Sequence, residues 1–364
     1  MSKSFCSLGL MSGTSADGID ASIIQSDGDT QYSVILDHYF KYNQEIYDKI
    51  HNLKDIINDK KDLKNLSKKM QKLEKEITIF HAKAVNKLIK KNKLKVDLIG
   101  FHGQTIYHNP KEKISKQLGD GKLLSKLTKK NIIFNFREND IKNGGQGAPL
   151  TPIFHKVLKK KFNIKEVTFV NIGGITNVTN LYNEFMSGTD IGPGMCLIDY
   201  WIRKNTKKNY DENGILAKSG KVDKKELSLL IENFKEKNSR RKDTKSFDTK
   251  HFNFSFGKKI SIEDGAATLT EFTAEIIISE LQKNQRKPDI ILCGGGRKNN
   301  FLVEKLKKKI GNIKLIDIFG VDGDFVESQA FAYIAIRSFL KFPISFPETT
   351  GVNKPCLGGI IIKN

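Results

Sequence analysis

Apolar positions along the chain follow two different periods, and their alternation predicts a mixed α/β protein. Apolar residues recur every three or four positions over 44–57 and 63–88, which predicts amphipathic helices with one face toward a core. Short apolar runs that end in glycine or polar turns predict strands instead. In the first part of the chain such runs lie at 5–10, 21–25, 32–40 and 96–101. This part therefore predicts three meandering strands, a helical segment and a buried strand.

The same alternation restarts further along the chain. Strand patterns recur at 132–136, 167–172, 176–181, 186–190, 289–293 and 357–362. Helical patterns recur at 151–160, 196–202, 265–283, 299–310 and 327–340. Residues 218–250 are rich in lysine and poor in large apolar side chains apart from 227–231, so we expect an exposed excursion with one helix there.

The repeated pattern and the length of 364 residues both favour two domains, because a single core stops growing at about 250–300 residues. Three strands in a meander, followed by a helix and a further strand, are the order of a ribonuclease-H-like domain. We expect one such domain over 1–131 with 347–364, and a second over 132–346.

Candidate chemistry is concentrated in Gly9–Asp20, between the first two predicted strands. Gly13 and Gly18 free the backbone so that N–H groups converge, and such donors suit phosphate oxygens. Asp17 and Asp20 supply carboxylates that bind Mg²⁺ directly or through water. An ordinary hairpin with a polar turn is the simpler alternative, but the stretch has more glycines, hydroxyls and carboxylates than a tight turn needs. It is not a Walker loop, because no Gly-Lys-Ser/Thr follows.

The charge and cysteine content narrow the class of protein. The net charge is +21, yet only 7 of the 62 basic residues are arginine, the residue on which nucleic-acid readers mainly rely. We therefore expect a solvated lysine surface and no nucleic-acid partner. The four cysteines are far apart, so neither a zinc site nor a redox motif is indicated. With no signal-peptide pattern and no membrane-spanning run, we expect a soluble cytoplasmic protein that does not bind membranes.

Two meander-and-helix halves with glycine turns resemble the actin-like ATPase and sugar kinase superfamily. This resemblance implies an α/β fold with two ribonuclease-H-like domains flanking a nucleotide cleft. It implies that ATP lies between the first glycine turn and a second turn at 173–174, with a third turn at 294–296 near adenosine and Mg²⁺ on Asp17 and Asp20. The ATP-binding residues would be Gly13, Thr14, Ser15, Ala16, Asp17, Gly18, Ile19, Asp20, Gly173, Gly174, Gly294, Gly295 and Gly296.

A set of motifs in fixed order narrows the resemblance over nearly the whole chain. The motifs are Gly9–Asp20, Phe101–Thr105, Gly144–Pro152, Asn171–Asn177, Asp190–Gly194 and Ala266–Leu269. Together they resemble the anhydro-N-acetylmuramic acid kinases of cell-wall recycling. The family's reaction opens a 1,6-anhydro sugar ring with water and transfers the γ-phosphate of ATP to the freed O6, giving N-acetylmuramic acid 6-phosphate.

The resemblance assigns one catalytic base, Asp190. Ordinary glycosidases need two carboxylates, one for the water and one for the leaving oxygen. Here phosphorus would capture the leaving oxygen, so one base suffices. Without the resemblance, a turn carboxylate or a metal ligand would be an equally good interpretation of Asp190.

The amino sugar would be held by residues from several motifs. Arg137 would pair with the lactyl carboxylate; the alternative is a surface arginine bound to Asp140. Glu327 would hydrogen-bond the sugar; the alternative is a helix N-terminal carboxylate. His102 would line the sugar pocket; a purely structural hydrogen-bonding role is an equally good interpretation. The predicted sugar-binding residues are Phe101, His102, Gln104, Thr105, Arg137, Asp140 and Glu327.

The chain also departs from the family pattern. Ile191 and Met195 stand where threonine and asparagine are usual, Asn135 replaces a common aspartate, and Lys245–Asp248 replaces Lys-Ser-Thr-Gly. The aromatic residue usual before Asp190 is absent. The missing asparagine leaves room for a kinase of a different amino sugar. A non-catalytic ATP-binding sugar sensor is an alternative from another class, although the presence of Asp190 argues against it. The sequence also leaves the oligomeric state open, including a homodimer.

Overall fold

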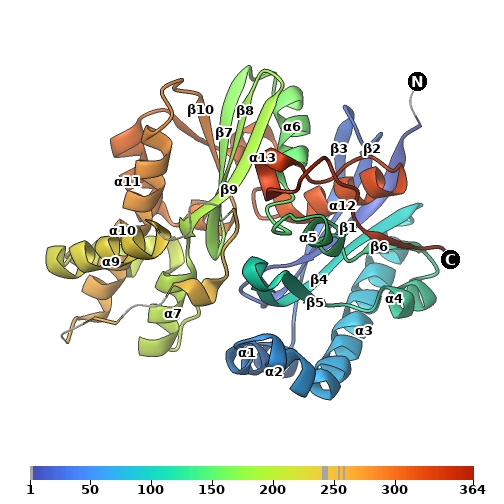
Figure 1. Cartoon of the computed structure of the whole chain (residues 1–364), viewed down its shortest axis with the longest axis horizontal. Helices are drawn as coiled ribbons and strands as arrows, with labels where there is room; N and C mark the ends of the chain where they lie inside the picture. Colours follow the sequence, from blue (N-terminus) through green and yellow to red (C-terminus); the bar gives the residue numbers. More distant parts are fainter. Residues whose placement is uncertain (1–2, 240–244, 253–254, 257–258) are drawn as a thin grey trace. The chain divides into compact units, whose positions relative to one another are not determined.

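The computed structural model divides into two compact units, Met1–Asn163 with Asp324–Asn364, and Ile164–Gly323 (Figure 1). The structure describes residues 3–239, 245–252, 255–256 and 259–364. Part of the predicted lysine-rich excursion, 240–244, lies outside the described residues. Within the described ranges, no helix combines the length and the apolar character that crossing a membrane requires.

The first unit is built on one mixed sheet. Its strands are β1 Phe5–Ser12, β2 Gly18–Ser26, β3 Tyr32–Lys41, β4 Leu98–Asn109, β5 Ile114–Leu118, β6 Asn131–Phe134 and β12 Ile360–Ile362. Among the described residues these strands form a seven-stranded sheet in the order β12-β6-β4-β1-β2-β3, with β5 paired to β4. Strands β1 to β3 are an antiparallel meander, whereas β4 and β6 run parallel to β1. This confirms the predicted ribonuclease-H-like order.

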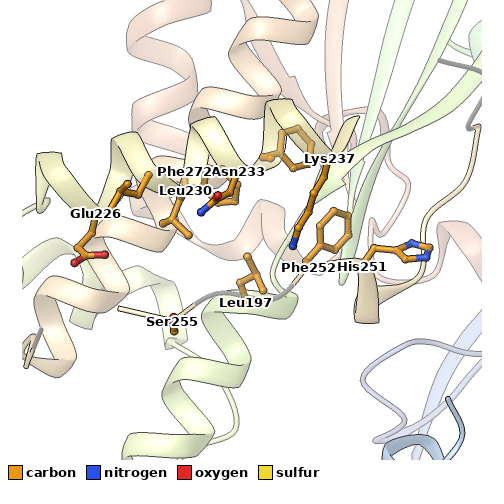
Figure 2. A pocket seen from close by; sticks show the side chains of 11 residues that line it. Leu197, Glu226, Leu230, Asn233, Lys237, His251, Phe252, Ser255 and Phe272 are labelled. Carbon is orange, nitrogen blue, oxygen red and sulfur yellow. The ribbon is translucent and has the colours of Figure 1, made fainter. Parts of the chain in front are cut away.

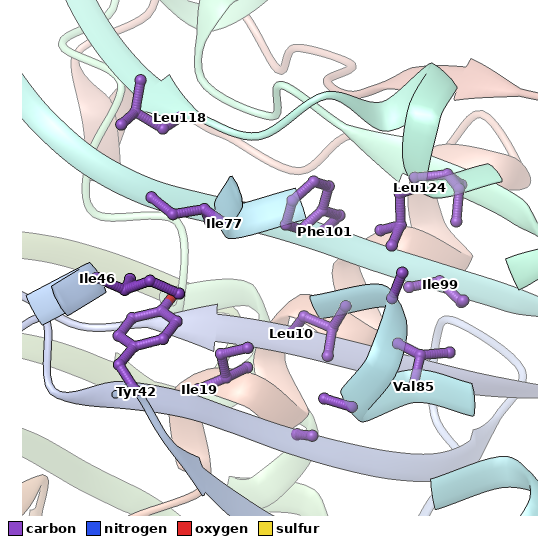
Figure 3. Close-up of a cluster of buried hydrophobic side chains, with 14 of the residues drawn as sticks. Leu10, Ile19, Tyr42, Ile46, Ile77, Val85, Ile99, Phe101, Leu118 and Leu124 are labelled. Carbon is purple, nitrogen blue, oxygen red and sulfur yellow. The ribbon is translucent and has the colours of Figure 1, made fainter. Parts of the chain in front are cut away.

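Helices cover this sheet. They are α1 Gln44–Ile56, α2 Lys60–Asn65, α3 Ser67–Asn92, α4 Gly121–Thr128, α5 Glu138–Lys142, α6 Pro152–Lys161, α12 Val326–Phe339 and α13 Pro347–Thr350. The predicted helix at 63–88 is interrupted at Leu66, where α2 ends and α3 begins. Figure 3 shows one core, in which Leu10 and Ile99 of the sheet meet Ile46 of α1 and Ile77 of α3.

Helix α12 packs directly on β1 and β4. A Cβ at Gly9 would lie 1.9 Å from the Ser328 carbonyl oxygen, and one at Gly100 would lie 2.3 Å from the carbonyl oxygen of Phe331. The absence of side chains at these glycines therefore sets the distance between helix and sheet.

The second unit repeats the strand order on a smaller sheet. Its strands are β7 Glu166–Ile172, β8 Ile175–Tyr182, β9 Phe185–Pro193, β10 Asp289–Cys293 and β11 Ile313–Leu315. The described residues give the order β11-β10-β7-β8-β9, a second meander with two parallel strands added beside β7. Its helices are α7 Cys196–Asn205, α8 Ile215–Ser219, α9 Lys224–Ser239, α10 Ile262–Gln282 and α11 Asn300–Ile310.

The boundaries between the units differ from those expected from the sequence. Residues 132–163 and 324–346 belong to the first unit, not the second. The physical reason is long-range pairing: β6 continues the first sheet beside β4, and α12 covers that sheet. Strands β5 and β11, with only five and three residues, were not predicted. Helix α4 was missed although Leu123, Leu124 and Leu127 have helical spacing.

Candidate active site

In the first unit, polar groups gather where strands β1 and β6 end on either side of the parallel strand β4. Ser12 pairs in register with Gln104, and Phe101 pairs with Phe134. The segments that follow these positions therefore emerge at the same edge of the sheet. In open α/β sheets, this carboxyl edge is where ligands bind.

The Gly13 turn, which joins β1 to β2, is held from two sides. The Gln104 side-chain amide donates to the Gly13 carbonyl (3.0 Å) and accepts from the Ser12 hydroxyl (2.6 Å). From α1, Lys54 Nζ donates to the Thr14 carbonyl (2.9 Å), and His51 Nε2 lies 3.0 Å from the carbonyl oxygen of Ser15. The turn is therefore positioned by the strand beside it and by the helix that follows the meander.

The atoms that an added Cβ would meet at each glycine distinguish turns with open space around the backbone from turns that are closely packed. At Gly13 the nearest atom would be Ser15 Oγ at 3.9 Å, and at Gly295 nothing lies within 4 Å. At Gly18, by contrast, the Phe40 carbonyl oxygen would be 2.5 Å away. The backbone at Gly13 is thus open to close approach by a ligand, as a phosphate cradle requires.

Arg137 is oriented by a buried histidine. Because a carbonyl only accepts, His102 Nδ1 must donate to the Gly103 carbonyl (2.8 Å). Nε2 then accepts from Arg137 Nε (3.1 Å) and Nη2 (2.8 Å). Burial, with the Arg137 cation second, holds the pKa of His102 well below its usual range. The imidazole is therefore neutral and serves as an acceptor for the guanidinium.

A buried carboxylate holds the loop on the other side of Arg137. Arg137 Nη1 donates to the Gly147 carbonyl (2.7 Å). The Gly147 N–H in turn donates to Asp140 Oδ1 (2.7 Å), and the Thr350 hydroxyl donates to Asp140 Oδ2 (2.5 Å). Asp140 is 1% exposed, so it would influence a ligand only by holding the Gly147 loop in place.

In the second unit, two glycine turns follow adjacent parallel strands. Asn171 of β7 pairs with Cys293 of β10, so the turns at 173–174 and 294–296 lie side by side. The first turn is fixed to the start of α7, where the Met195 N–H donates to the Gly173 carbonyl (2.8 Å). A glycine at 194 is needed for this contact, because a Cβ at that position would clash with the Gly173 carbonyl oxygen at 2.2 Å.

The turn at 294–296 is held by a buried arginine. Arg297 is 4% exposed, and it donates from Nε and Nη2 to the two carboxylate oxygens of Asp317 (both 2.8 Å). Its Nη1 also donates to the Gly294 carbonyl (3.1 Å). This bidentate pair ties the 294–296 turn to the loop after β11.

Asp190 lies on β9, close to the first of these turns. It lies three positions before Pro193, the last residue of the strand, a distance of about 10 Å at the usual rise of a strand. Its backbone N–H donates to the Lys245 carbonyl (2.8 Å), and its Oδ2 accepts from the Phe247 N–H (2.8 Å). Asn177 pairs opposite Asp190 on β8, so the two side chains share a face of the sheet.

A family model described as anhydro-N-acetylmuramic acid kinase matches residues 6–364. The chain belongs to this family. It is 52% identical to the anhydro-N-acetylmuramic acid kinase of Pelagibacter ubique, with all of both chains covered. It is 35% identical to that of Agrobacterium fabrum and 36% identical to that of Gluconobacter oxydans. The match to the Agrobacterium fabrum protein covers 98% of both chains. The match to the Gluconobacter oxydans protein covers 97% of this chain and 98% of the relative. As a member of this family the chain is a kinase.

Several sugar-binding residues predicted from the family resemblance occupy interior positions. Phe101 is 1% exposed within the core of the first unit, where its ring packs on His81, so its side chain is a core residue. Gln104 and Asp140 are also buried, and their hydrogen bonds hold the Gly13 turn and the Gly147 loop. We reassign these two as positioning residues. Two predicted ATP-binding residues at the Gly13 turn, Ala16 and Ile19, are also fully buried, so only their backbone atoms are available to ATP.

The remaining predicted sugar residues lie nearer the surface. Thr105, Arg137 and Glu327 are half-buried. Thr105 Oγ1 accepts from Gln117 of β5 (3.2 Å), and Glu327 lies in the first turn of α12. Their contacts with a sugar stay predictions.

The metal assignment rests on two carboxylates beside the Gly13 turn. Asp17 is exposed and accepts from the Ser15 hydroxyl (2.7 Å), and Asp20 is half-buried on β2. The described residues contain no cluster of three or more histidine, cysteine or acidic side chains that would hold a metal alone. Magnesium in kinases usually takes one or two carboxylates plus phosphate and water, so this sparse donor set fits Mg²⁺ brought with a nucleotide.

Sequence reasoning noted the motif Lys245–Asp248 but missed its contacts with Asp190. Lys245 and Phe247 lie in the segment expected to be an exposed excursion, yet Phe247 is 8% exposed and Ser246 is fully buried. The motif that contains Asn177 was recognised, but its place opposite Asp190 was not. A cavity of about 350 Å³ in this unit contains none of the predicted site residues; α9, Phe252 and Phe272 line part of it (Figure 2).

Proposed function

We propose that this kinase opens 1,6-anhydro-N-acetylmuramic acid with water and phosphorylates O6 with ATP, giving N-acetylmuramic acid 6-phosphate. Family membership over nearly the whole chain supports the substrate. The observation that carries the mechanism is Asp190, a carboxylate fixed by a backbone N–H and only a few residues from a glycine turn.

Asp190 would act as the single general base. It would take a proton from the water that attacks C1 of the sugar, and the C1–O6 bond would break as O6 attacks phosphorus. A separate acid for O6 is unnecessary, in contrast to ordinary glycosidases. The contacts with Lys245 and Phe247 would keep the carboxylate in place for this step.

ATP would supply the γ-phosphoryl group, with Mg²⁺ offsetting the charge of its oxygens. The open backbone at Gly13 and Gly173 supports phosphate contacts at these two turns, since a Cβ would meet no atom closer than 3.4 Å at either. The open backbone at Gly295 supports the contact with adenosine predicted for the 294–296 turn. Gly294 and Gly296 are instead crowded by Asn171 and Ile172, so they serve the packing of the turn.

Arg137 would bind the lactyl carboxylate of the sugar. Its guanidinium is already oriented by His102 and the Gly147 carbonyl, which reduces the entropy lost on binding. Cytoplasmic location is also part of the proposal, and the four free cysteines support a reducing compartment.

The test compares ATP turnover with anhydro-N-acetylmuramic acid and with plain N-acetylmuramic acid. We expect turnover with the anhydro sugar alone. Faster turnover with the plain sugar, or with another amino sugar, would assign a different kinase activity. In oxygen-18 water the product should carry the label at C1 and none in the phosphate; label on phosphorus would contradict the mechanism.

The Asp190→Asn variant tests the base. The amide keeps the shape of the carboxylate but accepts no proton, and loss of a general base typically slows a reaction about 10²–10⁴-fold. We expect at least that loss in kcat, with near-normal binding of ATP and sugar by calorimetry. Wild-type turnover by this variant would remove Asp190 from the mechanism.

A further inference from the structure

The segment Lys245–Phe247 pairs with β9 at the position of Asp190. The Asp190 N–H donates to the Lys245 carbonyl (2.8 Å), and the Phe247 N–H donates to Asp190 Oδ2 (2.8 Å). The Thr189 hydroxyl lies 3.2 Å from the Asp190 carbonyl oxygen and 3.4 Å from that of Lys245, so its single proton is shared between these two acceptors. The segment therefore contacts both the backbone and the side chain of Asp190.

An aromatic cluster anchors this segment. The Phe247 ring lies 5.3 Å from the Phe252 ring, and Phe252 lies 6.2 Å from Phe234 of α9. Phe234 in turn lies 5.9 Å from Phe272 of α10. Figure 2 shows Phe252 and Phe272 beside the cavity on this part of the unit. Because aromatic pairs at these distances attract one another, the cluster links the segment to two helices.

We propose that Lys245–Phe247 is a positioning segment for the catalytic base. This inference rests on the proposed function of Asp190. The terminal torsion of an aspartate is broad and poorly fixed by its own rotamer preferences. The Phe247 N–H selects one orientation of the carboxylate plane, and the aromatic cluster keeps that N–H in place. The base thereby reaches the attacking water without first losing rotational freedom.

The proposal also accounts for a departure from the family sequence pattern. Ser246-Phe247-Asp248 stands where Ser-Thr-Gly is usual. The contacts with Asp190 are made by backbone atoms, so they do not depend on the side chain at 247. The phenylalanine adds a ring that packs on Phe252, an anchor that threonine would lack.

The kinetic test compares two substitutions of the same residue. Phe247→Pro removes the N–H, whereas Phe247→Leu keeps it and retains an apolar side chain. Misplacement of a catalytic group by about 1 Å can cost on the order of 10²-fold, so we expect Phe247→Pro to lower kcat about 10–100-fold. KM for ATP and for the sugar should change little. The decrease in kcat should be much smaller for Phe247→Leu. Equal kcat values for the two variants would overturn the proposal.

A second measurement covers the case in which Phe247→Pro does not fold. Hydrogen exchange at the Phe247 amide, followed by NMR, should be slow in the wild type and fast in Asp190→Ala, with the amides of α10 unaffected. Unchanged protection at Phe247 would contradict the hydrogen bond. If Asp190→Asn is inactive but folded Phe247→Pro turns over normally, only the positioning segment fails. If Asp190→Asn is fully active, the proposed function of Asp190 fails as well.

Discussion

At the scale of single residues, the structure separates glycines that a ligand needs from glycines that the fold needs. Gly13 and Gly18 delimit the same turn, yet only Gly18 is packed against the backbone of β3. Sequence alone treats the two alike. Their surroundings predict opposite outcomes for the same substitution.

We expect Gly13→Ala to fold normally and to raise the KM for ATP. A hydrogen bond to a charged group is worth about 1.5–3 kcal/mol, so losing one phosphate contact should raise KM roughly tenfold or more. Thermal unfolding should be unchanged, because the nearest atom to the new Cβ is 3.9 Å away. Gly18→Ala is the matched control and should lower Tm. Unaltered ATP kinetics in folded Gly13→Ala would exclude this turn from the nucleotide site.

At the scale of elements, helix α12 shows how a late segment completes an early sheet. It begins more than 300 residues after β1, yet it lies against Gly9 and Gly100. The helix pattern of this segment was predictable, but its partner was not, because periodicity reports a buried face without naming what covers it.

We expect Gly100→Ala to destabilise the first unit by about 1–3 kcal/mol, the usual cost of overpacking. The new methyl would lie 2.3 Å from the Phe331 carbonyl oxygen, so α12 would have to move away from β4. Urea unfolding measures the change. Gly295→Ala, whose Cβ meets nothing within 4 Å, is the control for stability. Equal midpoints for the two variants would show that the contact is not tight.

At the scale of the whole molecule, buried neutral histidines are concentrated in the first unit. Burial lowers the pKa of His81 to about 4 and that of His155 to about 3, and His102 is lowered as well. An unfolded histidine takes up a proton near pH 6.5. Between that pH and the lower folded pKa, the unfolded chain binds more protons, so stability falls as the pH falls.

We expect the free energy of unfolding to drop between about pH 6.5 and pH 4, by up to about 1.4 kcal/mol per pH unit for each such histidine. His81→Leu should flatten this dependence. His81 Nε2 has no partner among the described residues, so the substitution leaves no former partner of that atom unpaired. Urea titrations at several pH values provide the measurement. An unchanged slope in His81→Leu would show that His81 does not contribute.

Local patterns in the sequence were enough to predict the two meanders, most helices and the glycine turns, whereas the candidate base came from the family resemblance of the motifs. Glycine turns, amphipathic periods and the motif around Asp190 all depend on residues close together in the chain. The unit boundaries, the burial of Phe101 and Asp140, and the Phe247 contact depended on the folded molecule. Phe247 reaches Asp190 across 57 positions of sequence through a backbone N–H, which every residue except proline possesses. Such a contact leaves no mark on residue type, so tertiary packing alone brings it into the site.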